Sequence, residues 1–228
     1  MININSDLGE LAGHDDEILP KVDSANVCCG LHAGSASVSI ATVRRCQELG
    51  VEVGAHPGFD DRENFGRTDV PLSPEDIEAL VRFQVAALAA VSDLGYIKAH
   101  GALYHRCQVD GEAADALARV AAQFGVGLMG QPGFELIAAA KRAGVPALRE
   151  GFADRAYLPD GKLAPRSQPG SVLEPEAAAE QAIRLARSGD FETICIHGDS
   201  PGAAEVARTV RHALEESGLK TGPLRGRR

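Results

Sequence analysis

The 228-residue sequence lacks the marks of several large protein classes. No apolar run approaches the roughly 20 residues that a membrane helix needs, so we expect no membrane association. The first residues, MININSDLGE, show no signal-peptide pattern, and the five cysteines include no CxxC pair, which favours a cytoplasmic protein with reduced thiols. The 32 acidic residues outnumber the 23 basic ones, and the resulting formal charge of −9 argues against a nucleic-acid partner.

Cofactor motifs with short spacing are also missing. There is no GxxxxGK[ST] loop to hold phosphates and no HExxH or CxxC zinc motif. The letters GxGxxG occur at 125–130, but they follow a predicted helix and contain a predicted strand, whereas the dinucleotide motif needs the strand first and the helix after.

Short β-rich runs alternate with longer Ala-rich amphipathic segments. The predicted strands are Ile2–Asn5, Ala25–Cys29, Val51–Gly54, Tyr96–Ala99, Val126–Met129, Leu148–Phe152 and Thr193–Ile196. The predicted helices are 36–49, 74–94, 111–124, 133–143, 175–188 and 201–217. Ser73-Pro74 and Ser200-Pro201 are helix-start signals. Left-handed glycines are expected just past the helices, at Gly50, Gly95, Gly125, Gly144, Gly189 and Gly218.

This alternation predicts an α/β fold, a (β/α) barrel of about seven parallel strands, with an open doubly wound sheet as the alternative. No composition break divides the chain, so residues 1–220 are interpreted as one domain and 221–228 as a disordered tail. The segments 57–72 and 156–173 are long, rich in Gly, Pro, Asp and Arg, and follow strands, which is typical of functional loops.

Titratable side chains follow six of the seven predicted strands. They are Asp7 and Glu10, then His32, His56, Lys98 with His100, Asp154 with Arg155, and His197 with Asp199. Because the carboxyl ends of parallel strands form one face, we expect these groups to converge at one mouth.

Each of these residues also has a structural interpretation. A single histidine in a glycine-rich turn is often structural, and Asp7 or Asp199 can cap a helix. Cys28, Cys29 and Cys195 lie in apolar runs and favour core packing as free thiols, with the neighbouring Cys28 and Cys29 on opposite faces. Separate strands also bring together a set of potential metal ligands, although no short-range spacing supports a metal. These are Asp7, His32, His56, His100 and His197.

Seven ordered motifs resemble the LamB/YcsF family, the 5-oxoprolinase A subunits, from Asn3 to about Leu214. They are NSDLGE, SANVCCGLHAG, GAHPGFDD, FGR, KAHGALY, FADRAY and ICIHGDSP. The sequence departs from the family pattern at Ser35, where an acid is usual, at Ala99, where proline is usual, and at Thr68, where a second arginine is usual.

The resemblance implies a barrel related to the glycoside hydrolase/deacetylase group. It implies ATP-dependent opening of 5-oxo-L-proline (pyroglutamate) to L-glutamate, carried out with partner subunits B and C. Because the chain shows no phosphate-binding loop, ATP handling is assigned mainly to the partners and lactam binding or ring opening to this chain. A divalent metal stays an open question.

Within that framework the candidate residues take roles by their chemistry. Asp7 or Asp154 is the candidate general base, with a carboxyl pKa raised by its surroundings, and His56 and His100 are candidates to pass a proton to the ring nitrogen. Lys98 and Arg155 are expected to hold a carboxylate or a phosphorylated oxyanion. The remaining substrate-binding candidates are Glu10, His32, His197 and Asp199.

Two alternative functions stay open. One is a metal-dependent deacetylase or amide hydrolase on the same barrel. The other is a non-catalytic component that binds a lactam or a sugar.

Overall fold

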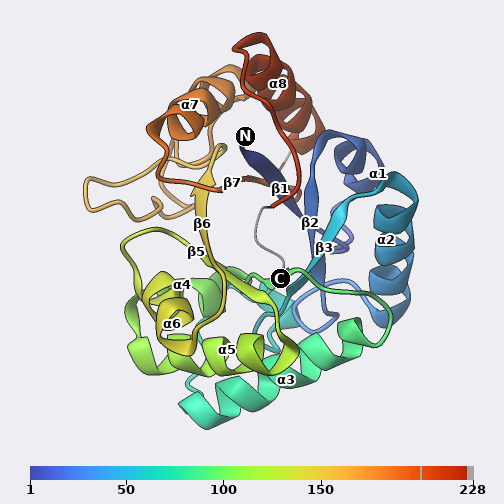
Figure 1. Cartoon of the computed structure of the whole chain (residues 1–228), viewed down its shortest axis with the longest axis vertical. Helices are drawn as coiled ribbons and strands as arrows, with labels where there is room; N and C mark the ends of the chain where they lie inside the picture. The colour runs from blue at the N-terminus through green and yellow to red at the C-terminus, as the bar shows by residue number, and fades with distance from the viewer. Residues whose placement is uncertain (201, 225–228) are drawn as a thin grey trace.

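The computed structural model describes residues 1–200 and 202–224, and the described chain forms a closed barrel of parallel strands surrounded by helices (Figure 1). The strands follow one another around the barrel in chain order, and the last pairs with the first. They are β1 Asn3–Leu8, β2 Ser24–Cys28, β3 Glu52–His56, β4 Tyr96–Ile97, β5 Gly127–Gly130, β6 Ala147–Phe152 and β7 Thr193–His197. The predicted seven-strand barrel is confirmed, and the open sheet is excluded.

The helices cover the outside of the barrel. They are α1 Asp15–Ile18, α2 Ala36–Leu49, α3 Pro74–Ala89, α4 Gly101–Val109, α5 Gly111–Phe124, α6 Glu135–Ala143, α7 Pro175–Ser188 and α8 Ala203–Glu216, with 3-10 turns η1 Leu19–Lys21 and η2 Arg62–Asn64. The sequence prediction missed α1, which is too short for a periodic pattern. It also missed α4, which begins at a glycine with φ +51° and has no side-chain N-cap.

Most helix boundaries follow their sequence signals. Ser73 accepts a hydrogen bond from Asp76 N ahead of Pro74, and five of the six predicted closing glycines have positive φ. Gly95 is the exception, because α3 ends at Ala89 and a turn follows before the next strand. Ser35, a departure from the family pattern, is the N-cap of α2 and accepts from Val38 N. Pro201, the predicted start of the last helix, lies outside the described residues.

The interior of the barrel is polar near β1, and this explains why that strand is longer than predicted. Asn5 Nδ2 donates to Thr193 Oγ1 at 2.7 Å, and Asn26 Nδ2 donates to Asn5 Oδ1 at 2.7 Å. The alternate residues Ile4 and Leu8 are fully buried in the main hydrophobic core. The polar residues of β1 face the barrel axis and its apolar residues face the helices, whereas buried parallel strands usually consist of apolar residues. The sequence Ser6–Leu8 was therefore interpreted as part of a loop.

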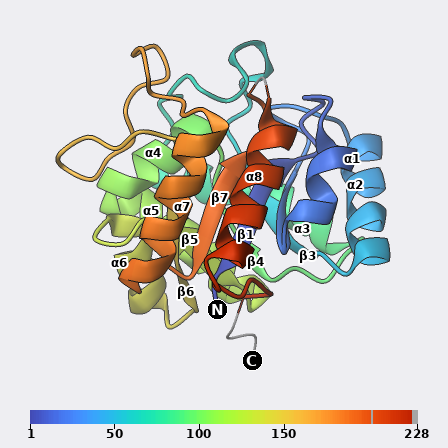
Figure 2. The same ribbon diagram turned by 90° about the horizontal axis from the view of Figure 1, so that it is seen from above.

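The long loops lie at one end of the barrel and the N-terminus lies at the other (Figure 2). The segment 156–173 is fastened by bridges of Arg155 with Val172 and of Tyr157 with Leu163. The start of the predicted disordered tail differs from expectation, because Thr221 bridges to Ile2 and Gly222 N donates to Ile2 O at 3.1 Å. Residues 225–228 of that tail lie outside the described chain.

Two further expectations concern cysteines and membranes. All five cysteines are free thiols, with Cys28 fully buried and Cys29 partly exposed, as expected for neighbours on opposite faces of a strand. Among the described residues, no helix has both the length and the apolar character needed to span a bilayer.

Candidate active site

A cavity of about 400 Å³ opens at the carboxyl ends of the strands, where the titratable groups were expected to converge. Eight of the ten candidate residues line it: Asp7, Glu10, His56, Lys98, His100, Arg155, His197 and Asp199. The other two, His32 and Asp154, are buried behind lining residues and hold them in place. The prediction that the strand exits converge at one end of a parallel barrel is therefore confirmed.

Asp7 lies in β1 at the floor of the cavity. Its Oδ1 accepts hydrogen bonds from Asn26 Nδ2 at 2.7 Å and Lys98 Nζ at 2.9 Å, and its Oδ2 lies 3.5 Å from His56 Nε2. Burial raises the pKa of the Asp7 carboxyl, but the charges of His56 and Lys98 outweigh burial and hold the pKa well below its usual range. The expected raised pKa is therefore wrong, and Asp7 is an anion at neutral pH.

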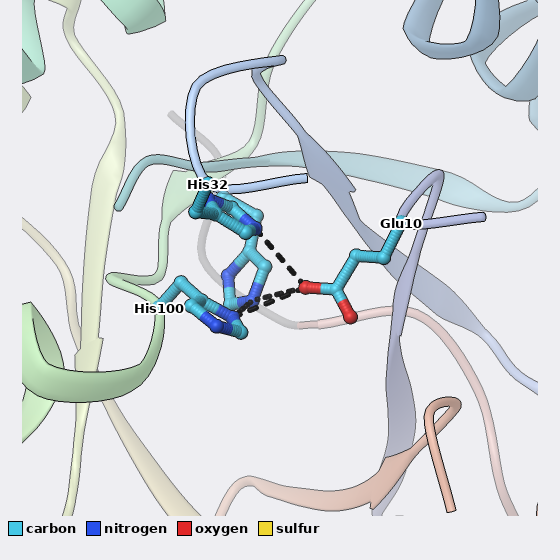
Figure 3. A group of neighbouring side chains, drawn as sticks. Glu10, His32 and His100 are labelled. Atoms are coloured by element: carbon cyan, nitrogen blue, oxygen red, sulfur yellow. Dashed lines mark hydrogen bonds and ion pairs between the residues drawn. The ribbon is translucent and has the colours of Figure 1, made fainter. Parts of the chain in front are cut away.

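Glu10, from the loop after β1, is the centre of a histidine cluster (Figure 3). Its Oε1 lies 3.1 Å from His32 Nε2, 3.1 Å from His100 Nδ1 and 3.5 Å from His56 Nε2. Burial raises the pKa of the Glu10 carboxyl, but hydrogen bonds with His100 and His32 lower it far more, so the carboxylate stays charged. A single carboxylate oxygen thus faces three imidazoles.

Two of these imidazoles are fixed by backbone carbonyls. His56 Nδ1 lies 2.8 Å from Lys98 O, and His100 Nε2 lies 2.8 Å from Phe65 O. A carbonyl oxygen only accepts hydrogen bonds, so both of these ring nitrogens carry the proton. The opposite nitrogens, His56 Nε2 and His100 Nδ1, face each other at 3.0 Å.

His32 supports the cluster from behind the cavity wall. Its ring stacks on His100 with centroids 3.9 Å apart and planes 4° from parallel. Burial lowers the pKa of His32 to about 4, so the ring is neutral at physiological pH. Gly66 permits this arrangement: a Cβ there would lie 2.7 Å from His32 Cβ, and its φ of +66° also favours glycine.

Lys98 is buried in the barrel rather than free at the mouth. Its Nζ lies 2.9 Å from Asp7 Oδ1, 2.9 Å from Glu150 Oε1 and 2.9 Å from Cys195 Sγ. Burial lowers the pKa of the Lys98 ammonium, but the charges of Asp7 and its other neighbours raise it well above the usual value. Sequence reasoning missed Glu150, although a glutamate inside a buried parallel strand signals that an opposite charge is needed.

His197 and Asp154 form a pair at the ends of β7 and β6. His197 Nδ1 lies 3.0 Å from Asp154 Oδ1, and His197 N donates to Asp154 Oδ2 at 3.1 Å. Burial raises the pKa of the Asp154 carboxyl, but the charge of His197 and its hydrogen bonds bring the pKa below the usual value. The expected raised pKa is wrong here too, and Asp154 fixes the His197 ring with Nε2 toward Asp7 Oδ2, 3.9 Å away.

Arginines surround the mouth of the cavity. Arg67 and Arg166 both form ion pairs with Asp199, the second at 3.1 Å, and both line the cavity. The guanidinium of Arg155 instead donates to Ser171 O at 3.2 Å and to Ala164 O at 2.5 Å, which fastens the loop 156–173. Sequence reasoning did not single out Arg67, although it is the arginine of the FGR motif, and it missed Arg166, Tyr104 and His105.

Comparison with known proteins identifies the family of the chain. The LamB/YcsF family model matches residues 2–228. The chain belongs to the LamB/YcsF family. It is 43% identical to the 5-oxoprolinase A subunit of Chloroflexus aggregans, over 96% of this chain and 96% of that protein. It is also 43% identical to the protein of the same name from Thermus thermophilus, over 96% of this chain and 98% of that protein.

Solved structures show the same fold. A lactam utilization protein from Thermus thermophilus has a TM-score of 0.91 and 41% identity, covering 98% of this chain and 99% of that one. A family 4 carbohydrate esterase from Streptomyces lividans has a TM-score of 0.57 at 10% identity, covering 97% of this chain and 91% of that one. At 10% identity the esterase shows a shared fold and nothing about activity.

Proposed function

We propose that this chain is the A subunit of an ATP-dependent 5-oxoprolinase that opens 5-oxo-L-proline to L-glutamate together with subunits B and C. The family membership and the names of relatives that match over nearly their whole length support this proposal. The observation that carries it is a small cavity with two arginines at its mouth and carboxylate and imidazole groups at its floor. The proposed use of ATP agrees with the cytoplasmic location expected from the sequence.

The substrate is a five-membered lactam that carries one carboxylate. Arg67 and Arg166 line the cavity and each pairs with Asp199 through one nitrogen, so their guanidinium groups have further N–H donors for the carboxylate or phosphate of a ligand. Lys98 has its ammonium against three protein groups and instead holds Asp7 in place. We therefore assign anion binding to Arg67 and Arg166.

A lactam is an unactivated amide, so its carbonyl carbon needs activation before water attacks. Transfer of the γ-phosphoryl group of ATP to the lactam oxygen, assigned to the partner subunits, makes that carbon electrophilic. A first water adds to the carbon, the C–N bond breaks, and the ring nitrogen takes up a proton. A second water then releases phosphate from the γ-acyl phosphate and leaves glutamate.

His197 is the group placed to take a proton from the attacking water. Asp154 holds its Nδ1 side at 3.0 Å, which leaves Nε2 to accept a proton and stabilises the imidazolium that forms. His56 and His100 lie on the other side of Asp7 and are assigned the delivery of a proton to the ring nitrogen. Each such positioned transfer contributes about 10²–10⁴-fold to the rate.

Reconstitution tests the division of labour. The isolated chain with ATP and 5-oxoproline should form no glutamate and release no phosphate, and addition of subunits B and C should produce both. Glutamate formation by the isolated chain at a rate near that of the mixture would refute the assignment of ATP to the partners. Calorimetric binding of 5-oxoproline without turnover in the complete mixture would favour a non-catalytic binding component.

A further inference from the structure

When His56 and His100 are both neutral, three ligand atoms in the histidine cluster face one another with no hydrogen between them. His56 and His100 present Nε2 and Nδ1 as lone pairs when neutral, because their other nitrogens donate to Lys98 O and Phe65 O. These two lone pairs lie 3.0 Å apart and face the Glu10 carboxylate at 3.5 and 3.1 Å. Electron-rich atoms this close in a buried site need a proton or a metal ion between them.

We propose that Glu10, His56 and His100 bind a divalent first-row transition metal ion, with Zn²⁺ as the best match to the donors. Ligands about 2.0–2.1 Å from a tetrahedral zinc ion lie roughly 3.3 Å from one another. The three separations here are 3.0, 3.1 and 3.5 Å, on both sides of that value. Two imidazoles and a carboxylate are also a donor set that zinc takes in catalytic sites.

The surroundings of the three ligands match those of metal sites. Histidines that bind a metal commonly donate their other N–H to a backbone carbonyl, and both His56 and His100 do so at 2.8 Å. Glu10, His56 and His100 all line the cavity, so a bound ion keeps an open position toward the ligand. Asp7 Oδ2, 3.5 Å from His56 Nε2, is a further oxygen on the same side.

His32 is excluded from this metal site although its Nε2 lies close by. The lone pair of an imidazole nitrogen lies in the plane of its ring, so a ligated metal also lies in that plane. The rings of His32 and His100 are parallel and stacked, with centroids 3.9 Å apart. One ion therefore cannot lie in the planes of both rings. His32 instead orients Glu10 by the 3.1 Å contact between Nε2 and Oε1.

A second group of potential ligands, Asp7, Cys195 and His197, does not suit a metal ion. The Lys98 ammonium already lies 2.9 Å from Asp7 Oδ1 and 2.9 Å from Cys195 Sγ, so a cation occupies that position. Within the described chain the metal is therefore assigned to the Glu10 cluster. A divalent ion there would supply Lewis acidity toward a carbonyl oxygen or a bound water. In the metal-bound protein that water, and not His56 or His100, would provide the proton for the ring nitrogen, because the free nitrogens of both imidazoles would be bound to the ion.

Metal titration tests the proposal without reference to the proposed function, because it needs neither substrate nor partner subunits. The full chain is stripped with a chelator, dialysed and titrated with ZnCl₂ in a calorimeter near neutral pH. One equivalent should bind, and His56→Ala, His100→Ala and Glu10→Gln should each weaken binding about 100-fold or more. The exposed His212→Ala is the matched control and should bind like the wild type.

X-ray absorption of the zinc-loaded protein then identifies the ligands. Two imidazoles per zinc are expected in the wild type, still two in His32→Gln, and one in His56→Ala. Circular dichroism verifies that each variant is folded. Three imidazoles in the wild type would overturn the exclusion of His32. No binding of one equivalent of zinc by the folded wild type would overturn the metal site and leave a proton as the cation of the cluster.

Discussion

Replacing Lys98 by methionine removes a buried positive charge and leaves a side chain of similar length. The Lys98 ammonium lies between Asp7 and Glu150, which are 5% and 0% exposed, and both carboxylates lose this cation in the variant. Breaking a buried ion pair in this way costs about 3–5 kcal/mol of unfolding free energy. We expect a loss of that size at slightly alkaline pH.

The loss should shrink as the solution becomes more acidic. In Lys98→Met the Asp7 carboxyl can take up a proton more readily, because the ammonium that lowers its pKa is gone, and this relieves the electrostatic cost at low pH. Adding Glu150→Leu to Lys98→Met removes one of the two charges and should recover at least about 1 kcal/mol. The exposed Lys162→Met should change stability by less than about 0.5 kcal/mol and is the control.

Urea unfolding monitored by circular dichroism measures these differences, with the denaturant slope compared between variants. A loss below about 1 kcal/mol at alkaline pH with an unchanged slope would show that Lys98 does not stabilise the two carboxylates as argued. A double variant no more stable than Lys98→Met would also contradict the reasoning.

The remaining predictions address stability and substrate binding. Between pH 7 and pH 5 the unfolding free energy of chelator-treated wild type, measured in urea, should fall by about 2 kcal/mol more than that of His32→Gln. The reason is that His32 takes up a proton near pH 6.5 in the unfolded chain but only near pH 4 in the folded protein, so stability is lost as the pH falls below 6.5. Equal pH profiles of the two proteins would contradict this. Gly66→Ala should cost about 1–3 kcal/mol in thermal unfolding, and wild-type stability would show that His32 and His100 tolerate the Cβ. Arg166→Ala in the assembled enzyme should raise KM for 5-oxoproline about 10-fold or more and leave kcat nearly unchanged. The exposed control Arg208→Ala should leave KM unchanged, and an unchanged KM in Arg166→Ala would remove Arg166 from substrate binding.

The convergence of the site was predictable because parallel strands impose it. Once His56 and His197 were placed at strand ends, the direction shared by all strands left one end of the barrel for both. The pairing register then sets the level of each side chain, for example Asp7 beside His197. The end of the barrel at which these residues lie could therefore be predicted without knowing any contact between residues far apart in the sequence.

The charges of the site were not predictable in the same way. Whether burial or a neighbouring charge controls the pKa of Asp7 depends on Lys98, which comes from a strand on another side of the barrel. His32 follows β2 like a candidate ligand, yet it stacks on His100 behind the cavity wall, and only the ring orientation reveals this. Arg166 reaches the mouth from a long loop whose course the sequence pattern leaves open.

The most direct test of whether the lactam ring opens in this cavity is to measure glutamate formation by the assembled enzyme that carries His197→Gln. Our account predicts that kcat falls about 10²–10⁴-fold, that 5-oxoproline binding measured by calorimetry changes little, and that the variant unfolds like the wild type. Wild-type turnover by the folded variant in the complete assembly would contradict the placement of ring opening at His197 and this cavity.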